Sequence, residues 1–352
     1  MSDRCWKEFW LSGTDGIFQL KATASGIDGN KLISGEFQTT PYISRSDSMN
    51  GVKSFVSSKQ KPKYKIDSGN CITIGLDTQT VFYQPHSFFT GQNIQVLRNK
   101  KLSQDLALFL VETIRKQMVK FNWGGNGATL GRLARLKIML PVDENGMPDF
   151  SYMESTIREL KKAKIIEYRK FLRKELKSIH HVDIPKLEEK KWEAFSIDTI
   201  FKIESGCDIY DKERVDGTIP YITSSAENNG IKYFISNMNS TYESNVIAVN
   251  RNGSVGYAFY HKYSALFSND CRKLKMLNCP RDNEAVSLFM ATQIMQQKEK
   301  YNYSLKMGTN RLSRQKIMLP IDDDGNPDYL YMEQYIKNIF YKKAKEYLDF
   351  KA

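Results

Sequence analysis

The sequence contains few residues that commonly hold metals or perform redox chemistry, and none at the spacing such sites need. Its 352 residues include 4 His and 5 Cys, and neither HExxH nor CxxC occurs. The cysteines are scattered, at Cys5, Cys71, Cys207, Cys271 and Cys279. These absences argue against a zinc ribbon, a zinc hydrolase and a disulfide framework. Reduced thiols fit the cytoplasm, which is the expected location.

Motifs for nucleotide chemistry and for membranes are also missing. The glycine-rich segment 124–127 lacks the GxxxxGK[ST] pattern of a phosphate-binding loop, and no Asn-Pro-Pro-aromatic motif of adenine methyltransferases is present. No apolar run approaches the roughly 20 residues of a membrane span, and the N-terminus lacks a signal-peptide core. Glu188-Glu189-Lys190 resembles a nuclease Glu-x-Lys, but it has no strand context and no counterpart elsewhere. We therefore expect no catalytic site, metal or cofactor on this chain.

The chain contains more basic than acidic residues. With 52 Lys and Arg against 40 Asp and Glu, the formal net charge is +12. The chain is also rich in aromatics, with 19 Tyr and 19 Phe, as expected of a folded protein rather than a disordered one. A basic balance favours a polyanionic partner, with nucleic acid ahead of membrane.

The chain is a tandem duplication. Residues 40–57 (TPYISRSDSMNGVKSFVS) match residues 219–236 (IPYITSSAENNGIKYFIS) at an offset of 219 − 40 = 179. Residues 132–154 (RLARLKIMLPVDENGMPDFSYME) match residues 311–333 (RLSRQKIMLPIDDDGNPDYLYME) at the same offset. Two blocks in one order at one offset predict two copies of a single module.

Each copy predicts an irregular β-rich domain followed by a long helix. Short alternating segments predict strands, and Asn50-Gly51 and Asn229-Gly230 predict hairpin turns. Later in each copy we expect a helix at residues 103–121 and 282–301, a glycine-containing loop at 123–131 and 303–310, and a short apolar strand before proline, 137–140 in the first copy.

The last helix of each copy carries apolar residues at spacings of four and three, as in a helix–helix seam. The seam residues are Met153, Ile157 and Leu160, and Met332, Ile336 and Ile339. Asp149 is expected to cap the first of these helices, at residues 150–178. The two helices are expected to pair as an antiparallel coiled coil; the alternative is that each folds back on its own domain.

The expected fold is therefore α+β, with two tandem β-rich domains, two spacer helices and pseudo-two-fold symmetry. The expected boundaries are 1–148 for the first domain, 149–182 for the central helix, 183–327 for the second domain and 328–352 for the C-terminal helix.

This order of domain, helix, domain, helix resembles the specificity subunit of a restriction–modification system. Pro41-Tyr42-Ile43 and Pro220-Tyr221-Ile222 before a polar loop, and Leu140-Pro141 and Leu319-Pro320 before the helix, carry the resemblance over essentially the whole chain. The passage into the helix lacks the Pro-Leu-Pro-Pro-Leu of typical type I subunits, and this departure resembles the type IIB or a related branch. The resemblance implies two target recognition domains that read double-stranded DNA. It also implies partner methyltransferase and nuclease subunits, which bring S-adenosylmethionine and Mg²⁺.

Polar loops at equivalent places in the two copies supply the candidate DNA contacts, because Arg can pair with guanine, and Asn or Gln with adenine. In the first copy the candidates are Ser44, Arg45, Ser46, Gln92, Asn93, Asn126, Thr129, Arg132 and Arg135. In the second copy they are Thr223, Ser224, Ser225, Arg251, Asn252, Ser254, Asn269, Lys306, Thr309, Asn310, Arg311 and Arg314. The arginines that follow the last loop of each copy suit phosphates.

Two other functions remain open at this stage. A non-catalytic coiled-coil scaffold or inhibitor that binds proteins predicts little salt-dependent affinity for DNA. A nuclease or methyltransferase acting alone predicts motifs that the sequence lacks.

The purified chain supplied with S-adenosylmethionine and Mg²⁺ is expected to neither methylate nor cleave DNA, since no catalytic constellation is visible in its sequence. Methyl-transfer and cleavage assays on the chain alone, and again with its partner subunits, test this. Activity of the chain by itself would contradict the interpretation.

Overall fold

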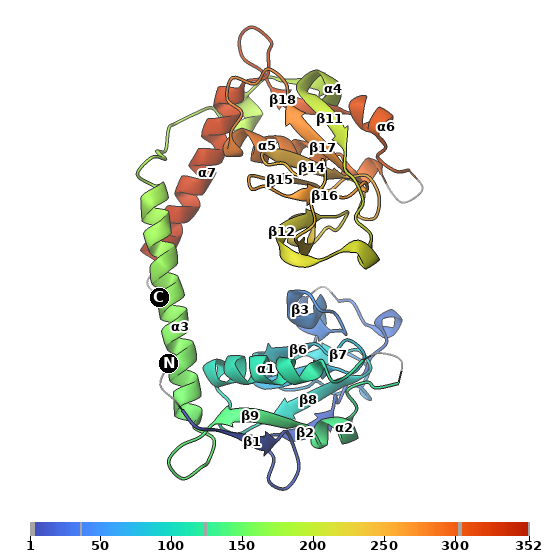
Figure 1. Ribbon diagram of the computed structural model, residues 1–352, viewed down its shortest axis with the longest axis vertical. Coiled ribbons are helices and arrows are strands. Elements are labelled where there is room, and N and C mark those ends of the chain that lie inside the picture. The colour runs from blue at the N-terminus through green and yellow to red at the C-terminus, as the bar shows by residue number, and fades with distance from the viewer. Residues whose placement is uncertain (1–3, 36, 123–124, 302–304, 351–352) are drawn as a thin grey trace. The chain divides into compact units, whose positions relative to one another are not determined.

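The computed structural model describes residues 4–35, 37–122, 125–301 and 305–350. The chain divides into two compact units, Met1–Tyr168 and Arg169–Ala352 (Figure 1).

The described residues of unit 1 form three small sheets and three α-helices. Its strands are β1 (Trp6–Trp10), β2 (Gln19–Ala22), β3 (Gln38–Ile43), β4 (Val52–Ser57), β5 (Cys71–Gly75), β6 (Val81–Gln84), β7 (Phe89–Thr90), β8 (Ile94–Arg98) and β9 (Lys137–Pro141). Its α-helices are α1 (Gln104–Met118), α2 (Leu130–Ala134) and α3 (Phe150–Glu175), the last of which continues into unit 2, and its 3-10 turns are η1 (Gly29–Lys31) and η2 (Met49–Gly51). The sheets have the orders β2-β8-β5-β6, β4-β3-β7 and β1-β9.

Unit 2 repeats this arrangement. Its strands are β10 (Trp192–Ser196), β11 (Phe201–Ser205), β12 (Asp216–Ile222), β13 (Ile231–Ile235), β14 (Val246–Asn250), β15 (Ala258–His261), β16 (Leu266–Phe267), β17 (Cys271–Met276) and β18 (Lys316–Pro320). Its α-helices are α4 (Ile197–Ile200), α5 (Glu284–Met295), α6 (Thr309–Ser313) and α7 (Tyr329–Asp349), and its 3-10 turns are η3 (Leu187–Glu189), η4 (Asp211–Glu213), η5 (Asn228–Gly230) and η6 (Lys298–Lys300). The sheets have the orders β11-β17-β14-β15, β13-β12-β16 and β10-β18, so every strand of unit 1 has a counterpart here.

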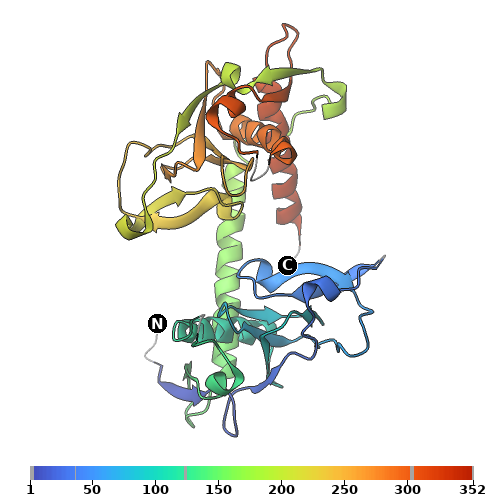
Figure 2. The ribbon, with the colours of Figure 1, turned by 90° about the vertical axis from the view of Figure 1, so that its right-hand side faces the viewer.

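In each unit the four-stranded sheet lies between the other two sheets (Figure 1). The three-stranded sheet, with its hairpin, forms one end of the unit, and the sheet that joins the first and last strands forms the other. The hairpin β12–β13 can be followed in a second view by its yellow colour (Figure 2). The candidate residues lie mainly in loops, some of which connect two strands of one sheet while others connect different sheets.

The Asn-Gly dipeptides form the hairpin turns that the sequence predicts. In β3–β4, Asn50 and Gly51 have φ angles of 57° and 77°, and in β12–β13, Asn229 and Gly230 have φ angles of 54° and 77°. Both values lie in the left-handed region, which asparagine and glycine tolerate best. A Cβ on Gly230 would also lie 2.9 Å from the carbonyl oxygen of Thr223, so this position needs glycine.

The core of each unit lies between the four-stranded sheet and the helix after it. In unit 1, Leu106, Leu110 and Ile114 of α1 are fully buried against Ile72 and Leu97 of the sheet. This is the apolar spacing expected of a buried helical stripe. In unit 2, α5 has buried side chains around its circumference.

An aromatic stack recurs at the same place in both units. The rings of Trp6 and Phe109 have centroids 6.3 Å apart with an interplanar angle of 21°. Those of Trp192 and Phe289 are 6.2 Å apart with the same angle. The stack joins the first strand of each unit to its buried helix, so the duplication extends to the packing of individual side chains.

The start of each long helix is fixed by an aspartate cap. Asp149 Oδ1 accepts a hydrogen bond of 2.9 Å from the N–H of Tyr152, which confirms the expected cap, and Asp328 accepts one of 2.9 Å from Tyr331. Arg4 forms an ion pair with Asp149, and Lys190 lies 2.8 Å from Asp328. The N–H of Tyr152 and then Arg4 hold the pKa of Asp149 below its usual range.

The first residue of the expected seam in each long helix packs into the core of its own unit. Met153 and Met332 are fully buried in the cores of units 1 and 2, which differs from the helix–helix seam expected for them. Ile336 packs partly buried against the core of unit 2, and Ile157 is half-buried. Leu160 and Ile339 are exposed, at 56% and 44%.

Within unit 2, the last two turns of α3 and the segment after them run along α7 in the opposite direction. Arg169 donates to the carbonyl oxygen of Phe350 at 2.7 Å. Farther along, Asn338 of α7 accepts from the N–H of Val182 at 3.1 Å and donates to its carbonyl oxygen at 2.7 Å. Leu172 of α3 is buried.

Some element boundaries differ from those expected. The helix expected at 282–301 ends at Met295, and the separate turn η6 follows it. The helices expected at 103–121 and 150–178 are shorter, because Ser103 is the N-cap of α1 and α3 ends at Glu175. The loops expected at 123–131 and 303–310 lead into the short helices α2 and α6; residues 123–124 and 303–304 lie outside the described residues.

None of the helices in the described ranges combines the length and apolar character needed to cross a membrane.

Met153→Ala is expected to lower the free energy of unfolding of unit 1 by about 2–4 kcal/mol, since it leaves a cavity where α3 attaches to the core. Met147→Ala is the matched control, because Met147 is 60% exposed and its loss should change stability by less than about 0.5 kcal/mol. Urea unfolding of the full chain measures both. Equal effects of the two variants would contradict the assigned anchoring role.

Candidate nucleic-acid interface

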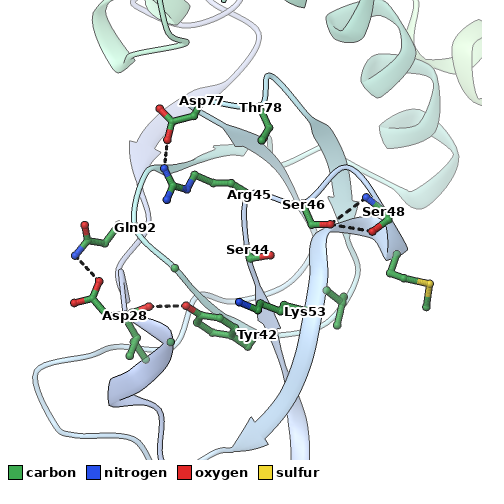
Figure 3. A pocket seen from close by; sticks show the side chains of 15 residues that line it. Asp28, Tyr42, Ser44, Arg45, Ser46, Ser48, Lys53, Asp77, Thr78 and Gln92 are labelled. Atoms are coloured by element: carbon green, nitrogen blue, oxygen red, sulfur yellow. Dashed lines mark hydrogen bonds and ion pairs between the residues drawn. The ribbon is translucent and has the colours of Figure 1, made fainter. Parts of the chain in front are cut away.

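A polar pocket opens beside the hairpin of unit 1, and we call it the hairpin pocket. Its volume is about 960 Å³. Four of the candidate residues, Ser44, Arg45, Ser46 and Gln92, line it. The remaining lining residues are Ile27, Asp28, Gly29, Tyr42, Ser48, Met49, Val52, Lys53, Asp77, Thr78 and Gly91. Segments far apart in the sequence thus present their polar side chains to one cavity (Figure 3).

The side chains of the hairpin pocket hold one another in place. Arg45 forms an ion pair with Asp77, and the Gln92 amide donates to Asp28 at 2.8 Å (Figure 3). The hydroxyl of Tyr42 donates to the carbonyl oxygen of Ile27 at 2.6 Å, and burial raises the pKa of this phenol. The polar groups are therefore oriented before any ligand binds, which reduces the entropic cost of recognition.

Asn93 lies beside this pocket, in the turn before β8. Its φ angle is 63°, a left-handed value that asparagine adopts more readily than most residues. It is exposed but is not among the residues that line the hairpin pocket.

The equivalent loops of unit 2 are held by hydrogen bonds to backbone carbonyl oxygens. The N–H of Ser254 donates to the carbonyl oxygen of Ser224 at 3.1 Å. The Asn250 amide donates to the carbonyl oxygen of Ser225 at 2.9 Å, and the hydroxyl of Thr223 donates to Gly230 at 3.3 Å. The candidates after β12 therefore lie against those in the loop between β14 and β15.

Two further candidates of unit 2, Asn252 and Asn269, link two more loops to these. Asn252 donates to Asp270 Oδ1 at 3.2 Å, and the N–H of Asn269 donates to Asp208 at 2.9 Å. With the contacts above, these hydrogen bonds join four loops, those after β11, β12, β14 and β16, at one end of the four-stranded sheet.

A cavity of unit 2, which we call the basic pocket, lies beside α6. Its volume is about 870 Å³. Six candidate residues line it, namely Arg251, Lys306, Thr309, Asn310, Arg311 and Arg314. Tyr301, Gly308 and Gln315 complete the lining. Several cations around one cavity suit an anionic ligand such as a DNA phosphate.

The corresponding cavity of unit 1 surrounds α2 and is smaller, about 600 Å³. The candidates Asn126, Arg132 and Arg135 line it, together with Glu8, Trp10, Lys120, Phe121, Leu136 and Lys137. Thr129 is the N-cap of α2 but is not part of the lining. The acidic Glu8 lies 2.9 Å from Lys137, so one of the cations here is already compensated.

Arg132 of α2 and Arg311 of α6 also stabilise the loop that precedes each helix. Arg132 donates to the carbonyl oxygens of Gly127 and Gly125 at 3.0 and 2.9 Å. Arg311 donates to the carbonyl oxygen of Lys306 at 2.6 Å. Both side chains are therefore structural as well as cationic, whereas Arg314 is exposed at the rim.

Arg272 is an important residue that the sequence analysis missed. It is only 4% exposed and lies in β17, where it donates to Thr309 Oγ1 at 2.7 Å and to the carbonyl oxygen of Asn269 at 2.9 Å. Burial, and then the nearby Arg251, lower the pKa of this guanidinium. Arg272 thus ties the basic pocket to the neighbouring loop, although a charged residue within a strand normally predicts exposure.

Two of the five cysteines, Cys71 and Cys271, lie in the interior of their units. Cys71 and Cys271 are fully buried, and burial raises the pKa of each thiol to about 12. Each stays protonated at neutral pH and behaves as a small core residue. Among the described residues, no group of three or more His, Cys, Asp and Glu side chains is arranged to hold a metal ion.

Comparison with known proteins identifies the family to which the chain is related. The family model described as "Type I restriction modification DNA specificity domain" matches the chain twice, at residues 14–168 and 189–347. A curated relative, the "Type II restriction enzyme BgcI specificity subunit S.BcgI" of Heyndrickxia coagulans, is 37% identical over 315 residues, which are 88% of each chain.

Solved structures of similar proteins match the chain at lower sequence identity. A type I restriction–modification S subunit from M. genitalium matches with a TM-score of 0.48 and 15% identity, covering 99% of this chain and 92% of that one. The HsdS subunit from Thermoanaerobacter tengcongensis matches with a TM-score of 0.33 and 12% identity, covering 97% of this chain and 90% of that one.

The two matches to the family model together span most of the chain, one in each copy of the duplication, and the curated relative covers a similar share. The chain therefore belongs to the family of restriction–modification DNA specificity subunits, the non-catalytic proteins in which two tandem domains recognise DNA sequence.

Proposed function

We propose that this chain recognises a split DNA site, with one half read by each unit. The recurrence of the candidate loops and of a cation-lined cavity in both units is the observation that carries the proposal. The loops differ in sequence between the units, so the two half-sites differ as well. A protein-binding scaffold, the alternative considered above, does not account for membership of a DNA specificity family.

The candidate residues divide between two roles. Those of the hairpin pocket and its unit 2 equivalents present amide, hydroxyl and guanidinium groups, which suit base edges. The cations around α2 and α6 suit phosphates, which position the protein without reading sequence. The net charge of +12 agrees with such a division.

The long helices act as the spacer between the half-sites in this proposal. They pair in antiparallel fashion, as the contacts of Arg169 and Val182 with α7 support. Their exposed residues, Leu160 and Ile339 among them, dock methyltransferase and nuclease subunits. Those partners bind S-adenosylmethionine and Mg²⁺, which this chain does not hold, and the complex acts on DNA in the cytoplasm.

The double variant R311A/R314A is expected to weaken DNA binding and to reduce the slope of log affinity against log salt concentration by about two, since each lost phosphate contact contributes about 0.9. The control K162A/K170A removes the same charge from exposed positions of α3 and should leave the slope unchanged. Fluorescence anisotropy with a duplex containing the site, over a range of salt concentrations, measures both. If the two variants behave alike, α6 does not contact phosphates.

Insertion of one heptad into α3 is expected to lengthen the spacer of the DNA site by about three base pairs and to leave both half-sites unchanged. Seven helical residues add roughly 10 Å and keep the apolar seam nearly in phase, while B-DNA advances about 3.4 Å per base pair. An insertion of two residues rotates the seam by about 200° and should prevent assembly. Sequencing of methylated sites in cells measures the spacer. An unchanged spacer in an active heptad variant would rule out the helices as its ruler.

A further inference from the structure

Among the residues that the structure describes, Arg45 is the only arginine that lines the hairpin pocket, and a carboxylate fixes its position. Arg45 follows β3, and Asp77 lies in the turn between β5 and β6. Their side chains form an ion pair across the pocket, with 44% of the arginine and 20% of the aspartate exposed (Figure 3). The guanidinium is therefore held in place and remains accessible from solvent.

The presence of Asp77 in this pocket needs a physical explanation. A carboxylate close to DNA is repelled by phosphates, so it weakens binding unless it has another role. Its turn is well braced, because the Gln79 amide donates to the carbonyl oxygen of Asp77 at 2.7 Å and the N–H of Gln79 donates to Gly75 at 3.0 Å. A rigid carboxylate that orients an arginine reduces the side-chain entropy which that arginine loses on binding.

The ion pair with Asp77 uses one nitrogen of the Arg45 guanidinium and leaves the edge that can pair with a base available. The contact with Asp77 is made by Nη1 of Arg45. Within the described ranges, Nε and Nη2 of Arg45 make no hydrogen bond. Nε and Nη2 present two parallel N–H groups, which match the O6 and N7 acceptors of guanine in the major groove.

Unit 2 has neither the arginine nor the aspartate at the equivalent positions. The repeat places Ser224 at the position of Arg45, an offset of 224 − 45 = 179. Alignment of β5 with β14 places Asn252 at the position of Asp77, and Asn252 instead donates to Asp270. The nearest cation in that loop, Arg251, lines the basic pocket.

We propose that Arg45, oriented by Asp77, reads one guanine in the half-site of unit 1, and that unit 2 has no guanine reader at the equivalent position. This inference rests on the proposed function and adds the identity of one base, the residue that reads it and the residue that positions the reader.

The test uses the full chain in complex with its methyltransferase subunits, and the readout is the set of methylated sequences. Arg45→Ala should make one G·C position of one half-site degenerate, with discrimination reduced roughly ten- to hundred-fold, while all other positions stay required. Asp77→Asn should relax the same position to a smaller extent. The double variant R45A/D77N should resemble R45A, because a positioning residue has no effect once the reader is absent.

Two further variants control for folding and charge. Arg45→Lys keeps the charge but not the parallel donors, so it should retain DNA binding and still lose discrimination at that position. Arg4→Ala removes the Arg4–Asp149 ion pair, which lies outside the hairpin pocket, and should leave the recognised sequence unchanged. The unfolding temperature of each variant shows whether it is folded; if R45A is not, R45K supplies the readout.

The outcomes separate this inference from the function on which it rests. If the wild-type complex marks a split site and R45A or R45K still requires every base of it, the reader assignment is wrong and the proposed function stands. Relaxation of an A·T position, or of both half-sites, would also overturn the assignment. If the wild-type complex methylates no defined sequence, the proposed function is wrong, and this inference, which rests on it, is wrong as well.

Discussion

Pairing between the first and last strands closes each unit, and the positions of the candidate loops depend on it. β1 pairs antiparallel with β9, with Trp6 opposite Pro141 and Trp10 opposite Lys137. β10 pairs with β18 in the same way. This pairing brings the chain of unit 1 back to its starting point after about 135 residues. One turn follows, and the N–H of the capping Asp149 then donates to the carbonyl oxygen of Pro141 at 3.0 Å. The helix therefore leaves each unit at a point fixed by backbone hydrogen bonds rather than by loops.

The closed scaffold and the candidate loops divide the sequence into a constant and a variable part. The strand Lys-Ile-Met-Leu-Pro is identical in the two copies and has the same alternation of buried and exposed residues. By contrast, Ser44-Arg45-Ser46 becomes Thr223-Ser224-Ser225 within equally built hairpins. A rigid scaffold with variable loops lets recognition change without loss of stability.

Repeats and turn chemistry made much of the fold predictable from the sequence. The 179-residue offset predicted two equivalent domains, and the Asn-Gly dipeptides and Asp149 acted locally as expected. The helices α2 and α6 were missed because each has only five residues and follows a glycine-containing loop with no periodicity to read. The burial of Met153 was also not predicted, since a spacing of four and three is the same for a helix that packs on a sheet and one that packs on another helix.

The candidate interface was predictable as a set of loops but not as pockets. Sequence placed Arg251 and Arg311 in separate loops, and only the fold shows that they line one cavity. Asp77 and Arg272 carried no sequence signal, because their roles depend on neighbours that are distant in the chain. Contacts of this kind follow from strand order, which local patterns do not specify.

The identical strands β9 and β18 have a consequence for how genes of this kind can change. Because Lys137–Pro141 and Lys316–Pro320 have the same residues and both pair with a strand that begins with tryptophan, an unequal crossover within this stretch joins the copies in register. The products would lose or gain one whole repeat of 179 residues, and no sheet would be interrupted in either. Duplication and deletion of entire recognition modules are therefore changes that this architecture tolerates, whereas a crossover inside the four-stranded sheet would combine cores that were not selected together.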